Sequence, residues 1–151
     1  MSKVNPELIS IFSIKVIRSD IQSDEIYLNK PVKPESIKVN IAQESGYNVE
    51  KKNIRIRLNI HLDSFDKENN PIGLKADFGI EYHLHVENLE EILVKNEDKT
   101  IIDGQFNTTI LSIIFSTARG IIFERTASTY FNGIILPVIN PTIFLKEIPI
   151  K

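Results

Sequence analysis

Residues 54–63 read IRIRLNIHLD, an unbroken alternation of aliphatic and polar side chains. Alternation with a period of two residues is typical of a β-strand with one buried face and one face in water. Residues 75–86 repeat the pattern, and the residues between the two segments, Asp66 to Gly73 (DKENNPIG), are rich in turn formers. The sequence therefore predicts an antiparallel β-hairpin.

Two earlier segments extend the predicted sheet. Residues 37–41 alternate in the same way and predict a third strand. Residues 12–22 also alternate, but the phase slips at Val16-Ile17. One extra residue in a strand reverses the faces of all residues after it, so the slip predicts a β-bulge. Together the four segments predict a four-stranded antiparallel sheet with one polar face.

The pattern changes after about Asn96. Residues 96–104, NEDKTIIDG, are predicted to form a polar loop. From Asn107 or Thr108, either of which suits a helix N-cap, apolar residues recur at helical spacing to about Thr126. The apolar arc of this helix is wider than one face of a four-stranded sheet can cover, so we expect its spare side to pack against another subunit.

Residues 130–150, YFNGIILPVINPTIFLKEIPI, are among the most apolar in the chain, yet they contain three prolines and a glycine. Proline interrupts helices, so no long regular helix is expected here. Loops are normally polar because they run over the surface. We expect this apolar segment either to be strapped across the core or to line a groove for apolar partners.

These elements predict one α+β domain spanning residues 1–151: a four-stranded antiparallel sheet with one long helix packed on its apolar face, followed by a proline-containing crossover loop. The chain has 18 basic and 20 acidic residues and a net charge of −2, which argues against a general affinity for nucleic acid. It contains no cysteine, which excludes disulfides, thiolate metal sites and a cysteine nucleophile.

The first residues, MSKVNPELISIF, lack the basic and long apolar regions of a signal peptide. No window approaches the ~20 apolar residues of a membrane span. We therefore expect a cytoplasmic protein that does not insert into membranes.

Signatures of catalysis are missing from the sequence: G-x-S-x-G, the P-loop, G-x-G-x-x-G and H-E-x-x-H do not occur. We expect no enzymatic activity, no catalytic residue and no cofactor. His83 and His85 share one face of their strand, and His61 is predicted to pair with a residue around 77–79. That register would place His61 more than ~10 Å from His83, too far for a shared zinc ion. No metal site is expected.

The C-terminal third resembles a known family. Residues 110–145 resemble the helix and crossover loop of SecB, a protein-export chaperone. The family's Phe-x-x-Ala-Arg helix core is matched by Phe115, Ala118 and Arg119. Its Leu-x-Pro-Val/Ile-Asn motif falls at Leu136, Pro137, Val138 and Asn140. Residues 12–22 and 76–89 are similar to the family's first and fourth strands, so the resemblance covers roughly residues 10–146.

The resemblance implies a holdase that binds unfolded preproteins in hydrophobic grooves, without ATP, and assembles as a dimer or a dimer of dimers. The residues expected to line the groove are Val39, Ile41, Phe131, Ile134, Ile135, Leu136, Ile139 and Phe144. Those expected at the oligomer interface are Leu111, Phe115, Ala118, Arg119 and Ile122. Delivery of cargo to the SecA ATPase would use acidic residues on the exposed sheet face, here Asp20, Asp24 and Asp77.

Other interpretations stay open at this point. Each groove residue could simply be core packing, and each aspartate an ordinary solvated carboxylate. Arg119 could contact a client polypeptide or a partner, or form an ion pair with Glu124 or a neighbouring chain. The family's second helix would be reduced to one turn within Thr142–Glu147. Two further functions compete with export: a chaperone dedicated to the antitoxin of a toxin–antitoxin system, and an adaptor subunit with a fixed partner.

Overall fold

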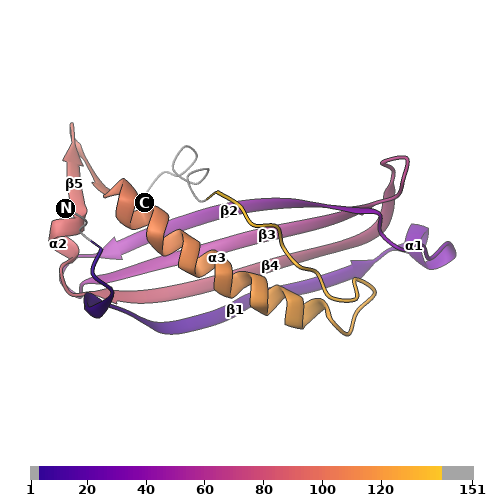
Figure 1. Ribbon diagram of the computed structural model, residues 1–151, viewed down its shortest axis with the longest axis horizontal. Coiled ribbons are helices and arrows are strands. Elements are labelled where there is room, and N and C mark those ends of the chain that lie inside the picture. The colour runs from indigo at the N-terminus through magenta and orange to yellow at the C-terminus, as the bar shows by residue number, and fades with distance from the viewer. Residues whose placement is uncertain (1–3, 141–151) are drawn as a thin grey trace.

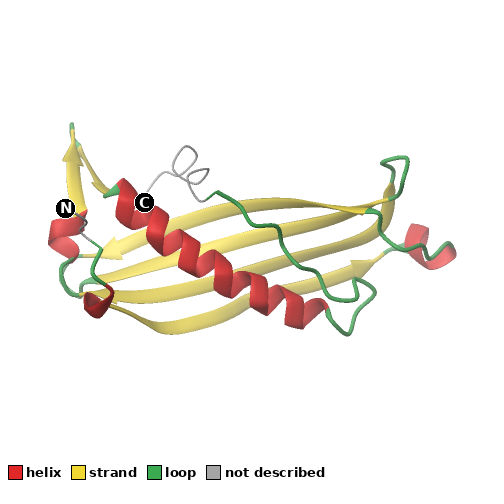
Figure 2. Cartoon of the chain, in the orientation of Figure 1, coloured by secondary structure: helices red, strands yellow, loops and turns green. Residues whose placement is uncertain are grey.

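The computed structural model describes residues 4–140. Its central feature is a four-stranded antiparallel sheet with the order β1-β4-β3-β2, crossed on one face by a single long helix, α3 (Figures 1 and 2). The α+β class and the predicted sheet are confirmed. Below, the face that α3 covers is called the inner face and the opposite one the outer face. The main elements are β1 (Ile9–Ser23), β2 (Ser36–Asn48), β3 (Asn53–Phe65), β4 (Pro71–Val86) and α3 (Gly104–Thr126).

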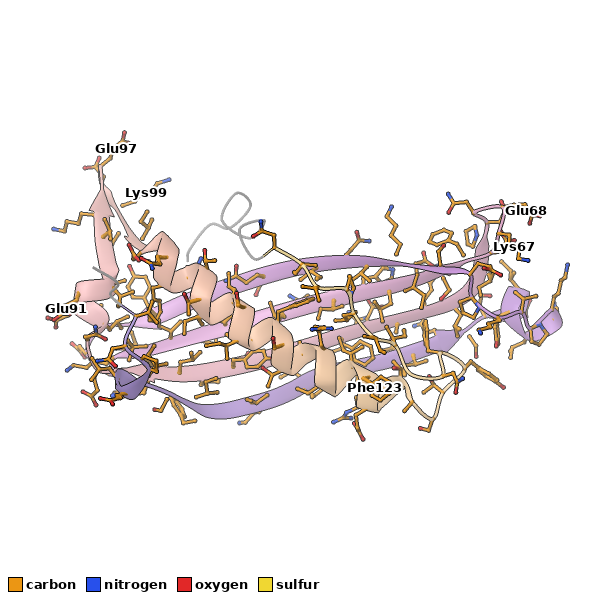
Figure 3. All side chains as sticks on the ribbon, in the orientation of Figure 1. Lys67, Glu68, Glu91, Glu97, Lys99 and Phe123 are labelled. Atoms are coloured by element: carbon orange, nitrogen blue, oxygen red, sulfur yellow. The ribbon has the colours of Figure 1, made fainter. Side chains whose placement is uncertain are left out.

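Shorter elements lie at the two ends of the sheet (Figure 1). They are the 3₁₀ turn η1 (Pro6–Leu8), α1 (Glu25–Asn29), α2 (Leu89–Ile92), β5 (Leu93–Asn96) and β6 (Lys99–Ile102). Helix α1 connects β1 to β2 at one end. Strands β5 and β6 form a separate hairpin at the other end, and its tip, marked by Glu97 and Lys99, points away from the sheet (Figure 3).

The register of the sheet agrees with the alternation in the sequence. His61 of β3 pairs with Asp77 of β4, as predicted. The pairing of β1 with β4 shifts between Val16 and Arg18, which confirms a bulge where the phase slips. A second shift, between Ile11 and Ser13, was not predicted.

The core lies between the inner face and α3. The inner residues of β3 and β4, from Ile54 to Leu62 and from Leu74 to Val86, are almost fully buried. The Tyr82 hydroxyl donates a hydrogen bond to the Ile114 carbonyl of α3 at 3.1 Å, and its burial raises the pKa to about 12. A buried hydroxyl needs such a partner, so this bond helps to fix the helix over the centre of β4.

Two predictions around the start of α3 are wrong. The N-cap is Asp103, whose carboxylate accepts a hydrogen bond from the Phe106 amide at 3.1 Å, and not Asn107 or Thr108. The first turn is polar at Gly104 and Gln105, which hides the start of the helix from a search for apolar periodicity.

The segment predicted as a polar loop, residues 96–104, also contains structure. It holds the turn and second strand of the β5–β6 hairpin, with Leu93 paired to Ile102 and Asn96 paired to Lys99. The strands are too short to show a clear alternation in the sequence, and the polar residues Glu97 and Asp98 occupy the turn between them.

Helix α3 is, by length and composition alone, long and apolar enough to cross a membrane. This differs from the prediction that no segment approaches a membrane span. The apolar residues of α3 have another use in this fold, because nine positions of the helix are buried, most of them against the inner face of the sheet. The core helix of a two-layer domain needs the same composition.

Candidate functional site

The crossover segment, defined here as residues 127–140, leaves the end of α3 and returns beside it over the inner face of the sheet (Figure 1). The turn that reverses the chain contains Asn132 and Gly133, which both have positive φ. A Cβ at position 133 would meet the ring of Phe123 at 3.0 Å, so the turn favours glycine for space as well as for φ.

Two side chains of α3 hold the crossover segment in place. The Thr126 hydroxyl accepts a hydrogen bond from the Ile134 amide at 2.8 Å. The Arg119 Nε donates a hydrogen bond to the Leu136 carbonyl at 3.1 Å. Of the alternatives considered for Arg119, an ion pair with Glu124 is not formed within residues 4–140, where Glu124 pairs with Arg125.

The side chains of the crossover segment divide between the core and the solvent. Phe131, Ile134 and Leu136 are buried, with exposed fractions of 6%, 5% and 0%. Ile135 and Val138, in contrast, are exposed by 73% and 84%. The segment thus covers the core with some of its side chains and exposes others as an apolar surface. Both possibilities that the sequence left open describe part of it.

A groove of about 760 Å³ opens where the crossover segment begins. On one side lie the connection between β1 and β2 and the start of β2; on the other lies the turn after α3. Tyr27 and Tyr130 contact each other across it, with ring centroids 5.1 Å apart. Its lining residues are Tyr27, Pro31, Val32, Lys33, Pro34, Ile37, Thr129, Tyr130, Phe131, Asn132 and Gly133. The lining mixes aromatic and aliphatic side chains with polar ones such as Lys33, Thr129 and Asn132, so the groove offers a ligand both apolar and polar contacts.

In the part of the chain that the structure describes, strand β2 forms an edge of the sheet with no further strand beside it, next to this groove. Val39 and Ile41 are half-buried on its inner face and pack against the core. Further along the same face, both amide atoms of Gln43 are buried without a hydrogen-bond partner among residues 4–140. A buried amide without a partner costs free energy, so this position does not add to the stability of residues 4–140.

Seven of the eight predicted groove residues are described by the structure, and they fall into three groups. Phe131, Ile134 and Leu136 support the crossover segment from below, and of these Phe131 also lines the groove. Ile135 is free to contact a ligand, while Val39, Ile41 and Ile139 are partly covered. Phe144 and the predicted helical turn within Thr142–Glu147 lie outside the described residues.

The residues predicted at an oligomer interface face their own subunit instead. Leu111, Ala118 and Ile122 have no exposed surface, and Phe115 is 5% exposed. These four have almost no area left to bury against a second chain, while Arg119, the fifth predicted residue, is half-buried; the interface itself stays a prediction. The exposed apolar residues of α3 are Ile113 and Phe123, the latter marked near the end of the helix in Figure 3.

Two of the three predicted SecA-binding aspartates come together. Asp20 and Asp77 are directly paired across β1 and β4, and Arg18 lies 3.8 and 3.6 Å from their carboxylates. Asp77 also contacts His61 at 2.7 Å. Arg18 offsets part of the negative charge of the pair, and His61 occupies one oxygen of Asp77, so the two carboxylates are not free of local contacts.

Asp24 lies apart from that pair, beyond the end of β1, and caps helix α1. Its carboxylate accepts hydrogen bonds from the amides of Ile26 and Tyr27 at 3.0 and 3.4 Å. The cap fixes the first turn of α1 and with it Tyr27 in the groove wall. In this structure Asp24 therefore serves the groove rather than the outer face.

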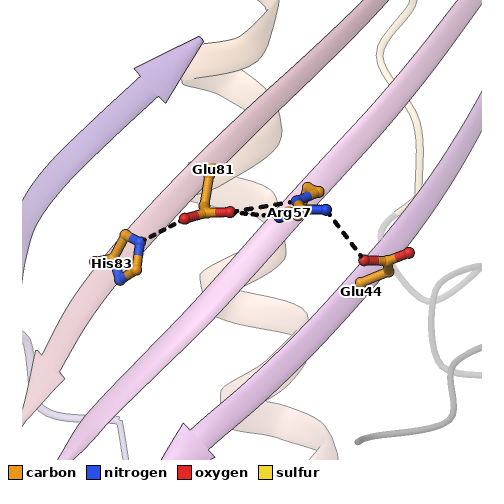
Figure 4. Close-up of polar contacts among 4 residues, drawn as sticks. All are labelled: Glu44, Arg57, Glu81 and His83. Carbon is orange, nitrogen blue, oxygen red and sulfur yellow. Dashed lines mark hydrogen bonds and ion pairs between the residues drawn. The ribbon is translucent and has the colours of Figure 1, made fainter. Parts of the chain in front are cut away.

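The outer face of the sheet carries a network of hydrogen bonds and ion pairs (Figure 4). Arg57 donates hydrogen bonds from Nε and Nη2 to Glu81 at 3.3 and 2.8 Å and lies 3.7 Å from Glu44. Glu81 also contacts His83 at 2.8 Å. The hydrogen bonds from Arg57 and then His83 lower the pKa of Glu81 from its ordinary value of 4.5.

Glu81→Gln is expected to make the free energy of unfolding depend less on pH in the acidic range. Because the pKa of Glu81 is lowered in the folded chain, its stabilising contribution is complete above pH 4.5 and disappears as the pH falls through the lowered value. Urea midpoints of the wild type and E81Q should therefore differ above pH 4.5 and converge as the pH falls through the lowered pKa of Glu81. Glu44→Gln is the control, because its longer contact with Arg57 predicts a smaller difference; an equal effect of both variants would contradict this assignment.

Within residues 4–140, no group of three or more histidine, aspartate or glutamate side chains is placed to hold a metal ion. His61, His83 and His85 each contact a carboxylate on the outer face instead.

Tyr27, Lys33 and Tyr130 line the groove but were not among the residues selected from the sequence. The signal for Tyr130 was present, since it starts the apolar tail. Tyr27 stands alone between Ile26 and Leu28 in a short segment without periodicity, and only its contact with Tyr130, more than a hundred residues later, gives it a role. For Gln43, the signal was the break in the apolar series after Ile41.

Comparison with known proteins identifies the fold. The structure of the SecB-like chaperone Rv1957 from Mycobacterium tuberculosis, in complex with a ChAD peptide from the Rv1956 HigA1 antitoxin, superposes with a TM-score of 0.61. The match covers 88% of this chain and 91% of that chain at 13% sequence identity. The fold is SecB-like. The resemblance noted in the sequence is thus confirmed at the level of the fold.

A protein of unknown function from Streptococcus agalactiae matches more weakly, with a TM-score of 0.48, 9% identity, and coverage of 86% of this chain and 97% of that chain. No family model matches the sequence, and no curated protein matches it.

Proposed function

We propose that the protein is a cytoplasmic, ATP-independent chaperone that holds extended polypeptide segments along the crossover segment. The observation that carries this proposal is the exposure of Ile135 and Val138, at 73% and 84%, on a segment that is firmly anchored by its neighbours. Full burial of an aliphatic side chain contributes ~1.5–3 kcal/mol, so these two positions and the aromatic groove together provide several kcal/mol of binding free energy before ordering costs.

The free edge of β2 supports the same proposal. An extended client polypeptide, or client, could add its backbone to an unpaired edge strand while its side chains contact Val39, Ile41 and the groove. Contacts of this kind depend little on sequence, which suits a protein that binds unfolded chains.

The experiment is suppression of aggregation. The purified protein should slow the aggregation of several unrelated denatured proteins, measured by light scattering, without ATP. Co-purification of one stoichiometric partner, with no effect on unrelated proteins, would instead favour an adaptor subunit. Turnover of a small molecule would favour an enzyme.

The double variant Ile135→Asp and Val138→Asp is expected to abolish this suppression and to leave the melting temperature nearly unchanged. Both side chains are exposed, and substitutions at such positions usually change stability by less than ~0.5 kcal/mol. Val49→Asp is the matched control, because Val49 is an exposed apolar residue after the end of β2, outside the groove. Retained suppression in the double variant would contradict the proposed binding surface.

Two client classes are consistent with this site: secretory preproteins destined for the Sec pathway, and antitoxins. The similarity to a chaperone solved with an antitoxin peptide favours the second. Delivery to SecA through the outer face receives less support, because the carboxylates of Asp20 and Asp77 are engaged with Arg18 and His61. A pull-down that tests an antitoxin fragment, a preprotein and SecA in parallel would separate the two client classes.

We further propose that the protein is a homo-oligomer joined at the edge strand β1. Within residues 4–140 this strand is unpaired on one side, and Phe12, Ile14 and Ile17 expose 58%, 43% and 47% of their surface. Exposed apolar edges of this length invite pairing with another chain. Light scattering should give a dimer or a dimer of dimers, and a concentration-independent monomer would exclude this interface.

A further inference from the structure

Three buried polar atoms on strand β2 have no hydrogen-bond partner among residues 4–140. They are the amide nitrogen and oxygen of Gln43 and the hydroxyl oxygen of Ser45. Ser45 is only 3% exposed, and Gln43 is half-buried. A buried polar group without a partner costs free energy, and folded proteins contain few of them. The stability of this chain therefore gives no reason for these three atoms.

The two side chains are neighbours on one face of the strand. Gln43 is paired with Leu58 of β3. Ser45 is paired with Ile56, and both of these β3 residues are buried on the inner face of the sheet. Alternate residues of a strand lie ~6.6 Å apart, and the same interval separates the side chains on one side of any extended polypeptide. One extended segment can therefore contact both positions.

The place of β2 at the edge of the sheet leaves room for such a segment. In the described part of the chain no strand pairs with β2 on the side opposite to β3. The side chains of a strand added there would lie opposite those of β2, with Cβ atoms ~4.5–5.5 Å apart. Because Gln43 is partly exposed, rotation about its side-chain bonds turns the amide toward the added strand without a change in the backbone.

From this arrangement we infer that Gln43 and Ser45 select client segments with hydroxyl or amide side chains, such as threonine or asparagine, at two alternate positions. This assignment rests on the proposed function and specifies its substrate class. The amide and the hydroxyl each offer a donor and an acceptor, so each can pair with either kind of group. On the same face Val39 and Ile41 are apolar and half-buried. The preferred segment thus has two apolar and then two polar residues at alternate positions, and alternate side chains are what gives strand addition its specificity.

A third buried hydroxyl provides an internal comparison. Ser64 also has no hydrogen-bond partner among the described residues, and its exposed fraction is 0%. It lies on β3, opposite Ile37, and β3 has a neighbouring strand on both sides. A strand added to the edge of β2 is separated from Ser64 by β2 itself, so Ser64 should play no part in the selection.

The test compares short peptides that differ only in hydroxyl groups. The first has valine at four alternate positions. In the second and third, threonine, which has the shape of valine, replaces the two valines nearest the amino end or the two nearest the carboxyl end, because a client can run along β2 in either direction. Fluorescence anisotropy should give one of the threonine peptides an affinity about tenfold higher than that of the valine peptide, as expected for two neutral hydrogen bonds.

Three variants assign the preference to residues. Gln43→Met removes the amide but keeps an unbranched side chain of similar length, so it should abolish most of the preference. It should also raise the urea midpoint by about 0.5 M, because an unsatisfied polar group is removed from the folded chain. Ser45→Ala should reduce the preference to about threefold. Ser64→Ala is the matched control, since it removes the same group from β3, and it should leave the preference unchanged.

Each contrary result overturns a separate statement. If the wild type binds all three peptides equally, or if Q43M keeps the full preference, selection by Gln43 is overturned and the chaperone proposal stands. If Q43M has a lower urea midpoint, the amide has a partner in the folded chain and is not available to a client. If S45A and S64A change the preference equally, the effect arises in the core and the assignment to the edge is overturned. If no peptide binds the wild type, the proposed function fails and the selection fails with it.

Discussion

Leu136→Ala is expected to lower the free energy of unfolding by about 2–5 kcal/mol, the usual range for deleting a fully buried leucine side chain. Leu136 has an exposed fraction of 0% although it lies in a segment without regular secondary structure. Its side chain belongs to the buried apolar core, so truncation leaves a cavity. Urea denaturation followed by circular dichroism would measure the loss.

The adjacent residue provides the control. Ile135→Ala removes a side chain of similar volume from the same segment, but Ile135 is 73% exposed and its truncation should cost less than ~0.5 kcal/mol. The two variants also separate stability from function, because I135A should weaken client binding in a fully folded protein. Equal losses of stability in L136A and I135A would show that the crossover segment is not anchored as described.

The alternation in the sequence was sufficient to predict the sheet. Residues 54–63 and 75–86 alternate without a break, and one face of each is buried along its whole length. Strand β2 shows where this signal ends. Only residues 37–41 alternate clearly, but the strand continues to Asn48, because its backbone stays paired with β3 after the inner positions become Gln43 and Ser45. Backbone pairing does not depend on hydropathy, so the alternation predicted a shorter strand than the one observed.

The side of the helix that contacts its own chain could not be predicted in the same way. Helical periodicity shows that α3 has a wide apolar arc, but it does not show which neighbour covers each part of it. Phe115 and Arg119 were among the residues expected at an oligomer interface. In the structure, Phe115 and Arg119 line one cavity with Val138 and Ile139, so the chain's own crossover segment lies against that part of the helix.

The candidate site was predictable in composition but not in geometry. The apolar, proline-containing tail identified the crossover segment, and its resemblance to SecB gave it a function to test. Adjacent residues such as Ile135 and Leu136 nevertheless have opposite environments, which no hydropathy pattern of an irregular segment reveals. Their division depends on two hydrogen bonds from α3, made by residues well upstream in the sequence.

One of those bonds yields the second large effect. Thr126→Val is expected to destabilise the protein by about 1–3 kcal/mol, the cost of leaving a buried polar group without a partner. The Thr126 hydroxyl is fully buried, donates to the Ile122 carbonyl at 2.7 Å, and accepts from the Ile134 amide at 2.8 Å. Valine keeps the shape of threonine but offers no acceptor, so the Ile134 amide loses its partner.

The readout that isolates this bond is hydrogen exchange at the Ile134 amide, which should accelerate in T126V because the acceptor is gone. Thr109→Val is the matched control on the same helix, since the Thr109 hydroxyl bonds only to the Gln105 carbonyl of its own helix and is exposed. It should change neither stability nor exchange at Ile134. Because Ile134 sits two residues before Leu136, release of this amide should also loosen the anchored half of the crossover segment and lower client affinity. Unchanged exchange in T126V would mean that the buried apolar contacts of Phe131, Ile134 and Leu136 hold the segment without help from the hydroxyl.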